Sequence, residues 1–568
     1  MADQHSSDTA PNSPTSPAVR ASLELFRWKV GLAILVLGML AELLVWTVIA
    51  QDRTHQVMYS MPVLSATALA TTLWWLFFSR LDWLVRGGGV LIVVAAFGVF
   101  RTQYRFEGFD GAMFPRFVSR NEPTREERLD EFLASSAAAA ETSPSAAATD
   151  GNDQPSIDPA AAGSGVVTGP LAVDAPQLLI TDTDWPEYRG PMRDGVVRSG
   201  IGDIDWTQTP DEVWRHPVGA GWSSFAVADG RAFTQEQRGE RECVVCYDVQ
   251  TGRQLWEHAD NVRFEEAMGG IGPRATPTLF DSRVYAVGAS GQLNCLDALT
   301  GEVFWTTNIL TDAGVANIPW AMAGSPLITG IAVIAAPGGK KGLIAYDRIS
   351  GEPLWHNGNH PASYAAPMLA TLGGVQQILW FHGDGLSGHA LDGGDQLWNF
   401  EWHNQPKINA AQPMVVDESN VIIGSGYALG AASINVRKGE TANDWSVDAR
   451  WTEKRRFKLK FNPAVRLGDY AYGLDEGILE CIDIRDGKMQ WKRGRYGYGQ
   501  LLLAGDVLIV QTEDGDVAFA RANPDQFEEL HRFPALSATT WNHPVLSSGL
   551  LLVRNAEEVV CFRLPTRQ

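Results

Sequence analysis

The stretch Pro273–Asn308, PRATPTLFDSRVYAVGASGQLNCLDALTGEVFWTTN, predicts four short β-strands. Its runs ATPTLF, RVYAVGA, QLNCLDA and EVFWTTN are rich in β-branched and aromatic residues, which favour strands. The pairs Asp281-Ser282, Ser290-Gly291 and Thr300-Gly301 separate these runs and favour tight turns. Because one small antiparallel meander cannot bury both of its faces, it needs copies of itself on either side.

Such copies are present, because the end of this stretch recurs along the chain. The related motifs are YDVQTGRQLW (Tyr247–Trp256), LDALTGEVFW (Leu296–Trp305), YDRISGEPLW (Tyr346–Trp355), LDGGDQLW (Leu391–Trp398), INVRKGETANDW (Ile434–Trp445) and IDIRDGKMQW (Ile482–Trp491). Successive closing tryptophans lie 43 to 50 residues apart, a period typical of a four-stranded propeller blade.

Each recurring position of the motif has a structural role. The glycine supplies the positive φ of a hairpin turn, the aspartate bonds turn amides, and the tryptophan packs against the next blade. Because the same aspartate returns in blade after blade, a structural role is favoured over catalysis. The tryptophans that we expect to dock the blades are Trp256, Trp305, Trp355, Trp398, Trp445 and Trp491.

Counting units gives eight blades. Complete four-strand units lie near residues 223–258, 273–308, 323–357, 363–400, 408–447, 458–494 and 499–533, the last with a degenerate motif. Three strands remain at the C-terminal end and one remains around Trp214, and together they complete an eighth blade that closes the ring. We therefore expect an all-β eight-bladed propeller of four-stranded antiparallel blades over residues 184–568.

The N-terminal part predicts a membrane anchor. After a polar tail over residues 1–24, which we expect to be disordered, residues 25–106 contain apolar segments that predict helices at about 28–50, 57–79 and 83–101. The third segment carries Asp82 and Arg86 at its start, so two spans remain an alternative to three. The run VLIVVAAFGVF is too apolar to leave in water, which favours three.

The number of spans decides the side of the propeller. Three spans place it opposite the N-terminal tail, whereas two place it on the same side. The positive residues Arg101, Arg105, Arg116 and Arg120 favour a cytoplasmic position and conflict with the first choice. We expect an integral protein of the inner, cytoplasmic membrane with an extracytoplasmic propeller.

Residues 107–183 predict a stalk and an acidic low-complexity linker. Thr124 and Glu127 have the spacing of a capping box, which predicts a short helix over Arg125–Ala140. From Glu141 to about Thr183 the chain is composed mainly of Ala, Ser, Pro, Asp and Gly, a composition that cannot bury enough surface to fold.

Charge and residue spacing argue against a nucleic-acid partner, a cysteine site and a metal site. A net charge of -20 argues against a nucleic-acid partner. Cys243 and Cys246 form a CxxC inside a predicted strand, where an i, i+3 pair points to opposite faces, so all five cysteines are expected to be packing residues. Glu265 and Glu266 are interpreted as a solvated pair, and the sequence predicts no metal site.

The pattern D-x-x-[TS]-G-x-x-x-W resembles the repeat of the pyrroloquinoline-quinone (PQQ)-type β-propellers over roughly Trp206–Leu564. That family includes the quinoprotein alcohol dehydrogenases and the non-catalytic outer-membrane β-barrel assembly lipoprotein. The resemblance implies the fold, but the tryptophans dock blades in enzymes and scaffolds alike.

Two main functions follow from the resemblance. A PQQ-dependent alcohol or sugar dehydrogenase implies a calcium site, a catalytic carboxylate, and often a pair of adjacent cysteines, and this sequence has no adjacent cysteines. We therefore favour a membrane-anchored, non-catalytic scaffold for another protein, which needs no cofactor and takes part in envelope protein assembly. The alternative is a membrane-bound dehydrogenase with PQQ and calcium, and a third possibility is a glycan-binding propeller.

A recurring proline at the start of each innermost strand marks the residues expected at the mouth of the central channel. Arg274 lies three residues before one of these prolines and has no counterpart in the other blades. Polar and aromatic side chains near the prolines predict a binding rim for a peptide or a sugar. The candidate residues of this rim are Trp222, Arg274, Trp320, Asn409, Asn462, Asn542 and His543.

Overall fold

The computed structural model describes residues 17–50, 53–79, 81–142, 177–441 and 443–567. It divides into two compact units. The first unit comprises Met1–Phe106 and Phe117–Asn121, and the second comprises Glu107–Arg116 and Glu122–Gln568.

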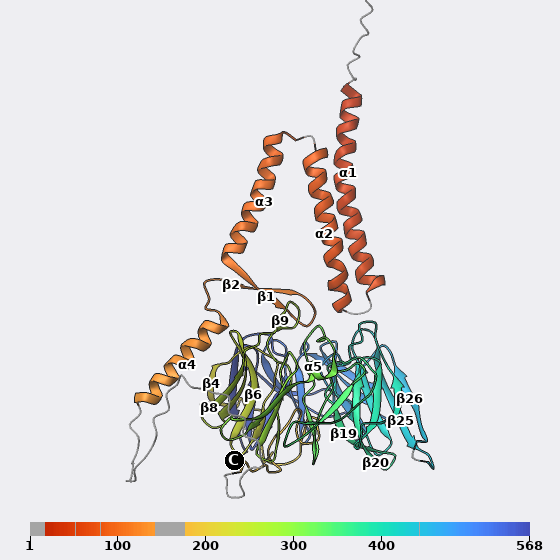
Figure 1. Ribbon diagram of the computed structural model, residues 1–568. Helices are drawn as coiled ribbons and strands as arrows, with labels where there is room; N and C mark the ends of the chain where they lie inside the picture. The colour runs from red at the N-terminus through yellow and green to blue at the C-terminus, as the bar shows by residue number, and fades with distance from the viewer. Residues whose placement is uncertain (1–16, 51–52, 80, 143–176, 442, 568) are drawn as a thin grey trace, which may run out of the picture. The chain divides into compact units, whose positions relative to one another are not determined.

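The first unit is built from apolar helices (Figure 1). They are α1 (Pro17–Leu44), continued by a π-helical turn at Val45–Ile49, α2 (Arg53–Phe78) and α3 (Trp83–Gln103). Three segments are long and apolar enough to cross a membrane, at Trp28–Ile49, Gln56–Phe78 and Trp83–Gln103, as the sequence predicts. Because α1 begins at Pro17, the expectation of a disordered tail is wrong for residues 17–24. Proline suits a first helical position, since it lacks only an N–H that has no helical partner there. Residues 1–16 lie outside the described part of the chain.

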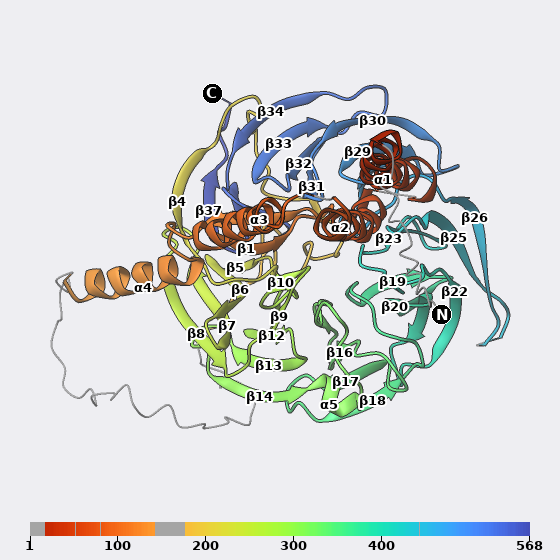
Figure 2. The same cartoon turned by 90° about the horizontal axis from the view of Figure 1, so that it is seen from above.

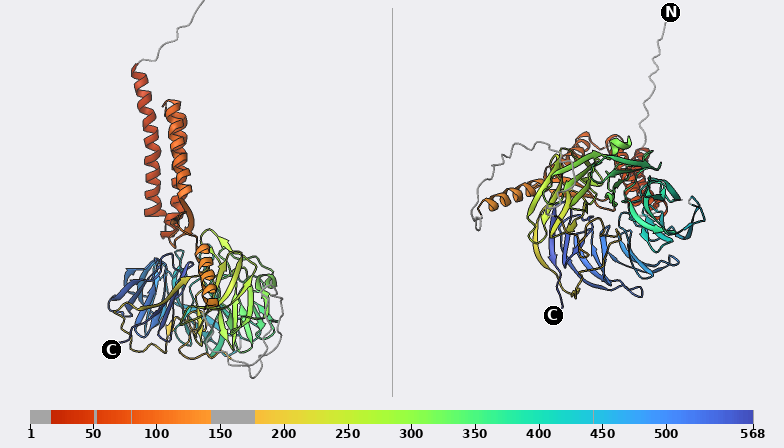
Figure 3. Two further views of the ribbon diagram at one scale, coloured as in Figure 1. Left: turned by 90° about the vertical axis from the view of Figure 1, so that its left-hand side faces the viewer. Right: turned by 60° about the horizontal axis from the view of Figure 1, so that its bottom comes forward.

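The helices α1 and α2 pack side by side, as two views show (Figures 1 and 3). Gly38 permits this approach, because a Cβ added there would lie 2.6 Å from the Thr67 side chain. The carboxylate of Glu42 accepts a hydrogen bond from Ser60 Oγ at 2.6 Å, and Ser60 Oγ accepts one from the Trp46 indole at 2.9 Å. The only acidic residue within the first apolar segment therefore has a polar partner on the neighbouring helix.

A short hairpin and a helix follow the apolar helices. The strands β1 (Tyr104–Phe109) and β2 (Pro115–Ser119) pair with each other, and α4 spans Arg125–Thr142. The predicted capping box is present, because Thr124 N donates to Glu127 Oε2 at 2.7 Å and Glu127 N donates to Thr124 Oγ1 at 3.1 Å. The helix α4 packs on the propeller, where Phe132 stacks on His216 with ring centroids 4.8 Å apart.

The propeller contains eight blades of four antiparallel strands, which form a ring when viewed along its axis (Figure 2). Blade one contains β5 (Ala226–Ala228), β6 (Arg231–Arg238), β7 (Arg241–Asp248) and β8 (Gln254–Asp260), and blade two contains β11 (Thr278–Phe280), β12 (Arg283–Val287), β13 (Gln292–Asp297) and β14 (Val303–Asn308). Blade three contains β15 (Leu327–Ile328), β16 (Ala332–Ala335), β17 (Leu343–Asp347) and β18 (Pro353–Asn357), and blade four contains β19 (Met368–Leu372), β20 (Val375–His382), β21 (Gly385–Ala390) and β22 (Gln396–Glu401). Blade five contains β23 (Met414–Val415), β24 (Asn420–Ser425), β25 (Gly430–Lys438) and β26 (Trp445–Glu453), and blade six contains β27 (Val465–Leu467), β28 (Tyr470–Asp475), β29 (Ile478–Asp483) and β30 (Met489–Arg495). Blade seven contains β31 (Gln500–Ala504), β32 (Val507–Gln511), β33 (Asp516–Arg521) and β34 (Glu529–Pro534), and blade eight contains β35 (Val545–Ser547), β36 (Leu550–Arg554) and β37 (Glu558–Arg563) with β4 (Asp211–Pro217). A short hairpin, β9 (Glu265–Glu266) with β10 (Gly270–Ile271), and the helix α5 (Ile309–Ala313) lie between blades.

The N-terminal strand closes the ring, as predicted. The strand β4 pairs antiparallel with β37, and Trp214 lies opposite Cys561. A further two-residue strand, β3 (Val196–Val197), adds in parallel to β31. The folded unit also begins earlier than expected, because Leu178 is buried and its N–H donates to Ser282 Oγ at 2.8 Å. Residues 143–176 of the predicted linker lie outside the described part of the chain.

The closing tryptophans contact the following blade in most cases. The indole of Trp256 rests on Gly301 and its Nε1 donates to Ala298 O at 3.1 Å, and Trp305 makes the same contacts with Gly351 and Arg348 O. In these hairpins the turn glycine has a positive φ, which only glycine adopts without strain.

Blade five departs from this pattern, and the prediction that Trp445 takes the repeat position is wrong. Trp451 lies opposite Ser433 in β25, rests on Gly487 and donates to Ile484 O at 2.9 Å. Trp445 lies six residues earlier, at the start of the long strand β26, and its ring lies beside Gly373 of the preceding blade. The unusual length of the β25–β26 hairpin, nine residues in each strand, moves the docking tryptophan along the chain.

The segment Trp185–Val197 fills the centre of the ring. Trp185 pairs with Val227 of blade one and Val196 pairs with Leu503 of blade seven, while Arg189 and Arg193 reach the segments before blades six, three and four. Two buried arginines hold it there by donating to backbone carbonyls that precede the innermost strands. We call this segment the central plug.

The two arginines of the central plug bond different blades. Arg189 donates to Ala464 O at 2.7 Å. Arg193 donates to Pro326 O at 2.6 Å and to Pro367 O at 2.7 Å. Burial lowers the pKa of Arg189, but backbone carbonyls accept hydrogens from Nη1 and Nη2 that burial removes from water, whereas Nε has no partner among the described residues.

Candidate functional site

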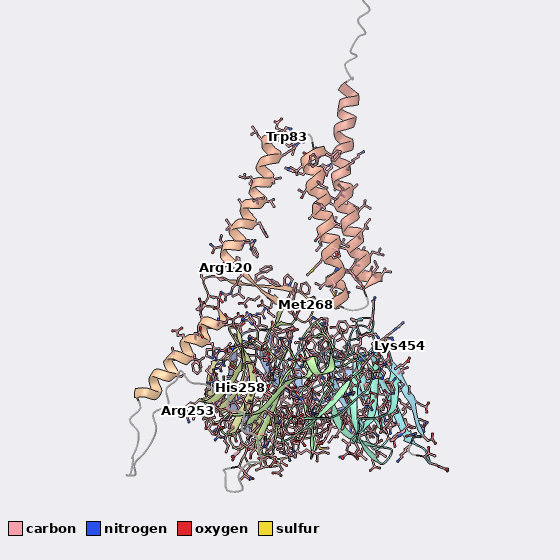
Figure 4. The ribbon with its side chains drawn as sticks, viewed as in Figure 1. Trp83, Arg120, Arg253, His258, Met268 and Lys454 are labelled. Carbon is pink, nitrogen blue, oxygen red and sulfur yellow. The ribbon has the colours of Figure 1, made fainter. Side chains whose placement is uncertain are left out.

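A cavity of about 210 Å³ lies within the propeller unit, and we call it the axial pocket. Its walls come from the segments that precede the innermost strands of several blades, together with the turn around Gly111 and the β9–β10 hairpin. Met268, at the tip of that hairpin, lines the pocket, and Figure 4 shows it at one end of the propeller. The larger side chains of its lining are Asp110, Met113, Tyr188, Trp222, Met268, Arg274, Trp320, Tyr364, Tyr427, Lys460, Phe461, Trp541 and His543.

Aromatic rings form much of the pocket wall. The rings of Trp222 and Trp541 have centroids 4.6 Å apart, and Phe461 meets Trp541 edge to face at 5.5 Å. On another side Trp320 and Tyr364 lie 5.5 Å apart. Indoles and phenols offer a large apolar surface together with a polar group, which suits a wall that binds an amphipathic ligand.

The indole N–H groups of this wall are held differently. Trp222 donates to Gly269 O at 2.5 Å and Trp541 donates to Glu513 Oε1 at 2.8 Å. The Nε1 of Trp320 is buried and has no hydrogen-bond partner among the described residues. A buried donor without a partner is unfavourable, so an acceptor group placed beside it would be stabilising.

Two buried cations face this pocket. Arg274 lies over the ring of Phe264 at 4.8 Å and 3.6 Å from the carboxylate of Glu266. Burial lowers the pKa of Arg274 to about 10, and Glu266 and Glu242 oppose that effect, so it remains charged at neutral pH. The Lys460 ammonium lies 4.5 Å from the ring centre of Tyr498. A positive potential inside an aromatic wall favours acceptor groups.

A turn of the chain itself forms part of the pocket wall. Residues 107–116 belong to the propeller unit, and Asp110, Gly111 and Met113 line the pocket. Gly111 N donates to Glu513 Oε1 at 2.6 Å, and Gly111 O accepts a hydrogen bond from Lys460 Nζ at 2.8 Å. The pocket therefore holds both polar groups of one backbone residue. Burial raises the pKa of Glu513, although the amides of Gly111 and Tyr498 act against this rise.

This turn is tight and needs glycine. Asp110 Oδ1 accepts hydrogen bonds from Ala112 N at 2.9 Å and Phe114 N at 2.8 Å, which fixes the backbone around Gly111. A Cβ at position 111 would lie 2.4 Å from the Tyr498 ring and 2.6 Å from Glu513 Oε1. A larger residue therefore cannot enter the pocket without displacing its wall.

The central plug forms the floor of the pocket. Tyr188 lines the pocket, and the neighbouring Arg189 lies 3.4 Å from His543 Nε2. Burial and the charge of Arg189 lower the pKa of His543 to about 3, so its imidazole is neutral at physiological pH. Its Nδ1 lies 2.7 Å from Pro544 O, a carbonyl that can only accept, so Nδ1 carries the proton.

The structure brings together four of the seven predicted rim residues, Trp222, Arg274, Trp320 and His543. The three asparagines are not part of the pocket lining. They are fully buried, and each donates to two backbone carbonyls, for example Asn409 to His382 O at 2.8 Å and Trp402 O at 3.0 Å. Asn462 donates to Tyr498 O and Gly499 O, and Asn542 donates to Gly221 O and Ser223 O. Their amides hold backbone segments together.

The sequence contained a signal for the residues that were missed. In the six recurring X-x-x-Pro segments, the residue three positions before the proline lines the pocket in every case. These residues are Arg274, Ala323, Tyr364, Ala410, Lys460 and Trp541. Lys460 is thus the counterpart that Arg274 was predicted to lack.

The cysteines and the acidic pair lie outside the pocket lining. The side chains of Cys243 and Cys246 lie in two different core clusters, as the strand period predicts, and burial raises the pKa of each to about 12. The prediction that Glu266 is solvated is wrong, because its carboxylate accepts from Met268 N at 2.8 Å and lies beside Arg274. It shapes the hairpin that bears Met268.

The pocket lining does not fit the calcium and PQQ that the resemblance implies. Calcium requires six to eight oxygen ligands, mostly carboxylates and carbonyls. Among the lining residues in the described part of the chain, Asp110 alone carries a carboxylate, and its Oδ1 already accepts two backbone N–H groups. The carboxylate of Glu513, directly behind this wall, accepts from Gly111 N, Tyr498 N and the Trp541 indole, so neither carboxylate is free to join a set of calcium ligands.

Comparison with known proteins defines the family. The sequence matches the family described as outer membrane protein assembly factor BamB over residues 201–306 and 240–493, which together span more than half of the chain. No curated protein sequence matches the chain.

Solved structures share the fold at low identity. Quinohemoprotein alcohol dehydrogenase from Comamonas testosteroni is 13% identical with a TM-score of 0.50, and the match covers 68% of this chain and 81% of that one. BamB from Moraxella catarrhalis is 17% identical with a TM-score of 0.45, and the match covers 63% of this chain and all of that one. The first likeness agrees with the ring of blades described above. By its repeats and by the extent of the family match, the chain belongs to the PQQ-like propeller family of outer membrane protein assembly factor BamB.

Proposed function

We propose that this protein is a membrane-anchored, non-catalytic propeller that binds a tight turn of another protein in its axial pocket. The observation that carries the proposal is the turn around Gly111, a peptide segment whose N–H and C=O are both bonded inside the pocket. A site that recognises backbone groups and apolar side chains accepts a polypeptide more readily than it performs redox chemistry.

The pocket chemistry supports a peptide ligand. Glu513 accepts a backbone N–H and Lys460 donates to a backbone carbonyl. The surrounding aromatic rings offer contacts for side chains such as Met113. The unpartnered indole N–H of Trp320 adds a further donor for a second carbonyl.

We infer that the partner is a protein of the cell envelope and that the propeller is extracytoplasmic in the inner membrane. The apolar helices support membrane attachment, and membership of an assembly-factor family supports a protein partner. The resident turn then acts as an internal ligand that the partner's turn replaces.

The test uses the purified full chain in detergent and a labelled peptide of residues 107–116, EGFDGAMFPR. In the variant Gly111→Val the resident turn is excluded by Tyr498 and Glu513. We expect this variant to bind the peptide and the wild type to bind it at least about tenfold more weakly, because its own turn competes.

Three controls make this test specific. A peptide with valine at the position of Gly111 should not bind, and the double variants Gly111→Val/Lys460→Met and Gly111→Val/Glu513→Gln should lose affinity. Equal binding to wild type and Gly111→Val, or no binding to either, contradicts a peptide site. Stoichiometric, calcium-dependent binding of PQQ contradicts the non-catalytic assignment and favours the dehydrogenase.

A further inference from the structure

A cluster of two histidines and one aspartate lies at one edge of blade four, outside the axial pocket lining. His360 precedes β19, His382 ends β20, and Asp384 lies in the turn between β20 and β21. One ligand atom from each of the three side chains lies within 4.8 Å of the other two. Imidazole nitrogen and carboxylate oxygen are common ligands of zinc and related divalent metals.

From this arrangement we propose that His360, His382 and Asp384 form a binding site for a divalent transition metal such as Zn²⁺. The inference does not depend on the proposed peptide binding, because the two sites share no residue. Three protein ligands leave a fourth position for water or for a group of a partner molecule.

The hydrogen bonds around the two imidazoles support this assignment. His360 Nε2 lies 3.0 Å from Gln396 Oε1, and His382 Nε2 lies 3.1 Å from Asn399 Oδ1. Both amide oxygens come from the strand β22 and accept from the ring N–H groups. This arrangement places the remaining lone pair of each ring on Nδ1. Metal-binding histidines characteristically donate their other ring N–H in this way, which fixes the tautomer.

Both Nδ1 atoms lie close to Asp384. His360 Nδ1 is 3.6 Å from Asp384 Oδ2, and His382 Nδ1 accepts a hydrogen bond from Asp384 N at 3.2 Å. Ligand atoms on a tetrahedral zinc ion lie about 3.3 Å apart, since each bond is about 2.0 to 2.1 Å long. The first separation is close to that value, and the imidazole of His382 must give up its backbone hydrogen bond to bind the ion.

The geometry also shows what must move. The two rings stack with centroids 3.8 Å apart and an interplanar angle of 5°, so binding requires them to tilt toward one ion. The Lys407 ammonium contacts Asp384 Oδ1 and supplies a positive charge at the carboxylate. We infer that the metal displaces this ammonium, whose side chain is 49% exposed and can move into solvent.

Sequence reasoning missed this site because its ligands do not form a recognisable motif. His360 is separated from His382 by a complete strand, and the repeat has no histidine at the position of His382 in the other motifs. A backbone hydrogen bond from Gly383 N to Pro361 O, at 2.9 Å, holds the residue after each histidine together and so places the two rings side by side.

The test titrates the full chain in detergent, without a histidine tag and freed of metal by a chelator. Zn²⁺ binding is followed by calorimetry, and Co²⁺ binding is followed by visible absorption. We expect one ion per chain, and we expect His360→Gln and Asp384→Asn each to weaken binding at least about tenfold. The matched control is His403→Gln, an exposed histidine outside the cluster, which should bind as the wild type does.

The variant Lys407→Gln gives the most specific result. Removing the competing ammonium should strengthen metal binding at least about threefold, a direction that misfolding cannot mimic, whereas loss of a purely structural ion pair predicts no gain. Absence of one-to-one binding by the wild type overturns the proposal. So does binding that His360→Gln and Asp384→Asn leave unchanged while their thermal unfolding stays close to that of the wild type.

Discussion

Replacing Arg193 of the central plug with methionine should destabilise the propeller, although the substitution changes no residue of a blade strand. The side chain of Arg193 is 3% exposed and donates to backbone carbonyls that precede the innermost strands of blades three and four. Methionine fills a similar volume but donates no hydrogen bond. The variant therefore isolates the contribution of these hydrogen bonds from that of packing.

The magnitude follows from the groups that lose their donor. Pro367 O and Ser325 O lose Arg193 Nη1, at 2.7 Å and 3.2 Å, whereas Pro326 O keeps the Thr278 hydroxyl at 2.8 Å. Leaving a buried carbonyl without a partner costs about 1 to 3 kcal/mol. Glu187 also loses its ion pair, but its side chain is 19% exposed and is partly solvated. We expect a total loss of about 3 kcal/mol in the free energy of unfolding.

Thermal unfolding of the full chain in detergent, followed by circular dichroism in the far ultraviolet, measures this loss. A propeller of roughly 390 residues has an unfolding entropy of about 0.8 kcal/mol per kelvin, so the expected decrease in Tm is about 4 °C. Arg253→Met, at an exposed position away from the pocket (Figure 4), should leave Tm within about 1 °C of the wild type. A Tm of Arg193→Met equal to that of Arg253→Met would refute the argument that the plug ties the inner strands together.

Two further predictions concern blade docking and pH. Chemical denaturation should show that Trp451→Ala lowers the free energy of unfolding by about 3 kcal/mol and that Trp445→Ala lowers it by less. The reason is that Trp451 donates to Ile484 O and covers Gly487 of the next blade. A larger loss for Trp445→Ala would contradict this assignment and show that Trp445 is the residue that docks blade five. Burial raises the pKa of Glu242 to about 7, with Asp260 adding to this rise and Ala289 N and Arg274 opposing it, so its proton is held more tightly in the folded state than in the unfolded state. The contribution of Glu242 to stability is therefore present below about pH 4.5 and is lost as pH rises to about 7. The difference in Tm between the wild type and Glu242→Gln should change over this pH range. A difference that stays constant contradicts the raised pKa.

The blades could be predicted because their determinants are local and repeated. The turn glycine, the aspartate and the tryptophan recur with a period of one blade, and each makes its main contacts within one hairpin or with the next. The closure by the strand around Trp214 followed from counting strands, since a ring with one incomplete blade leaves a sheet edge exposed. Blade five was misread because a longer hairpin separates Trp445 from the position at which a tryptophan can meet the next blade.

The plug and the pocket wall were harder to predict, because their contacts are not repeated. Arg189 and Arg193 bond carbonyl oxygens, which every residue carries, so no sequence pattern identifies their partners. Asn409, Asn462 and Asn542 show the opposite problem, since an amide near a channel suits a ligand and a backbone carbonyl equally well. Their complete burial and their carbonyl partners show that they serve the backbone.

The plug determines where a ligand can enter. With Tyr188 as its floor, the axial pocket opens at the end of the ring that carries the segments before the innermost strands, since those segments supply Arg274, Lys460 and Trp541. In an antiparallel blade the turn between the second and third strands lies at that same end, so Asp384 belongs to the same face as the pocket. The Gly111 turn is also bound at this face, and it is joined through β1 directly to α3, the last of the apolar helices. Under the proposed function, a partner turn that takes the place of the Gly111 turn would also free the segment that joins the propeller to α3, so that partner binding and release of this segment would be one event.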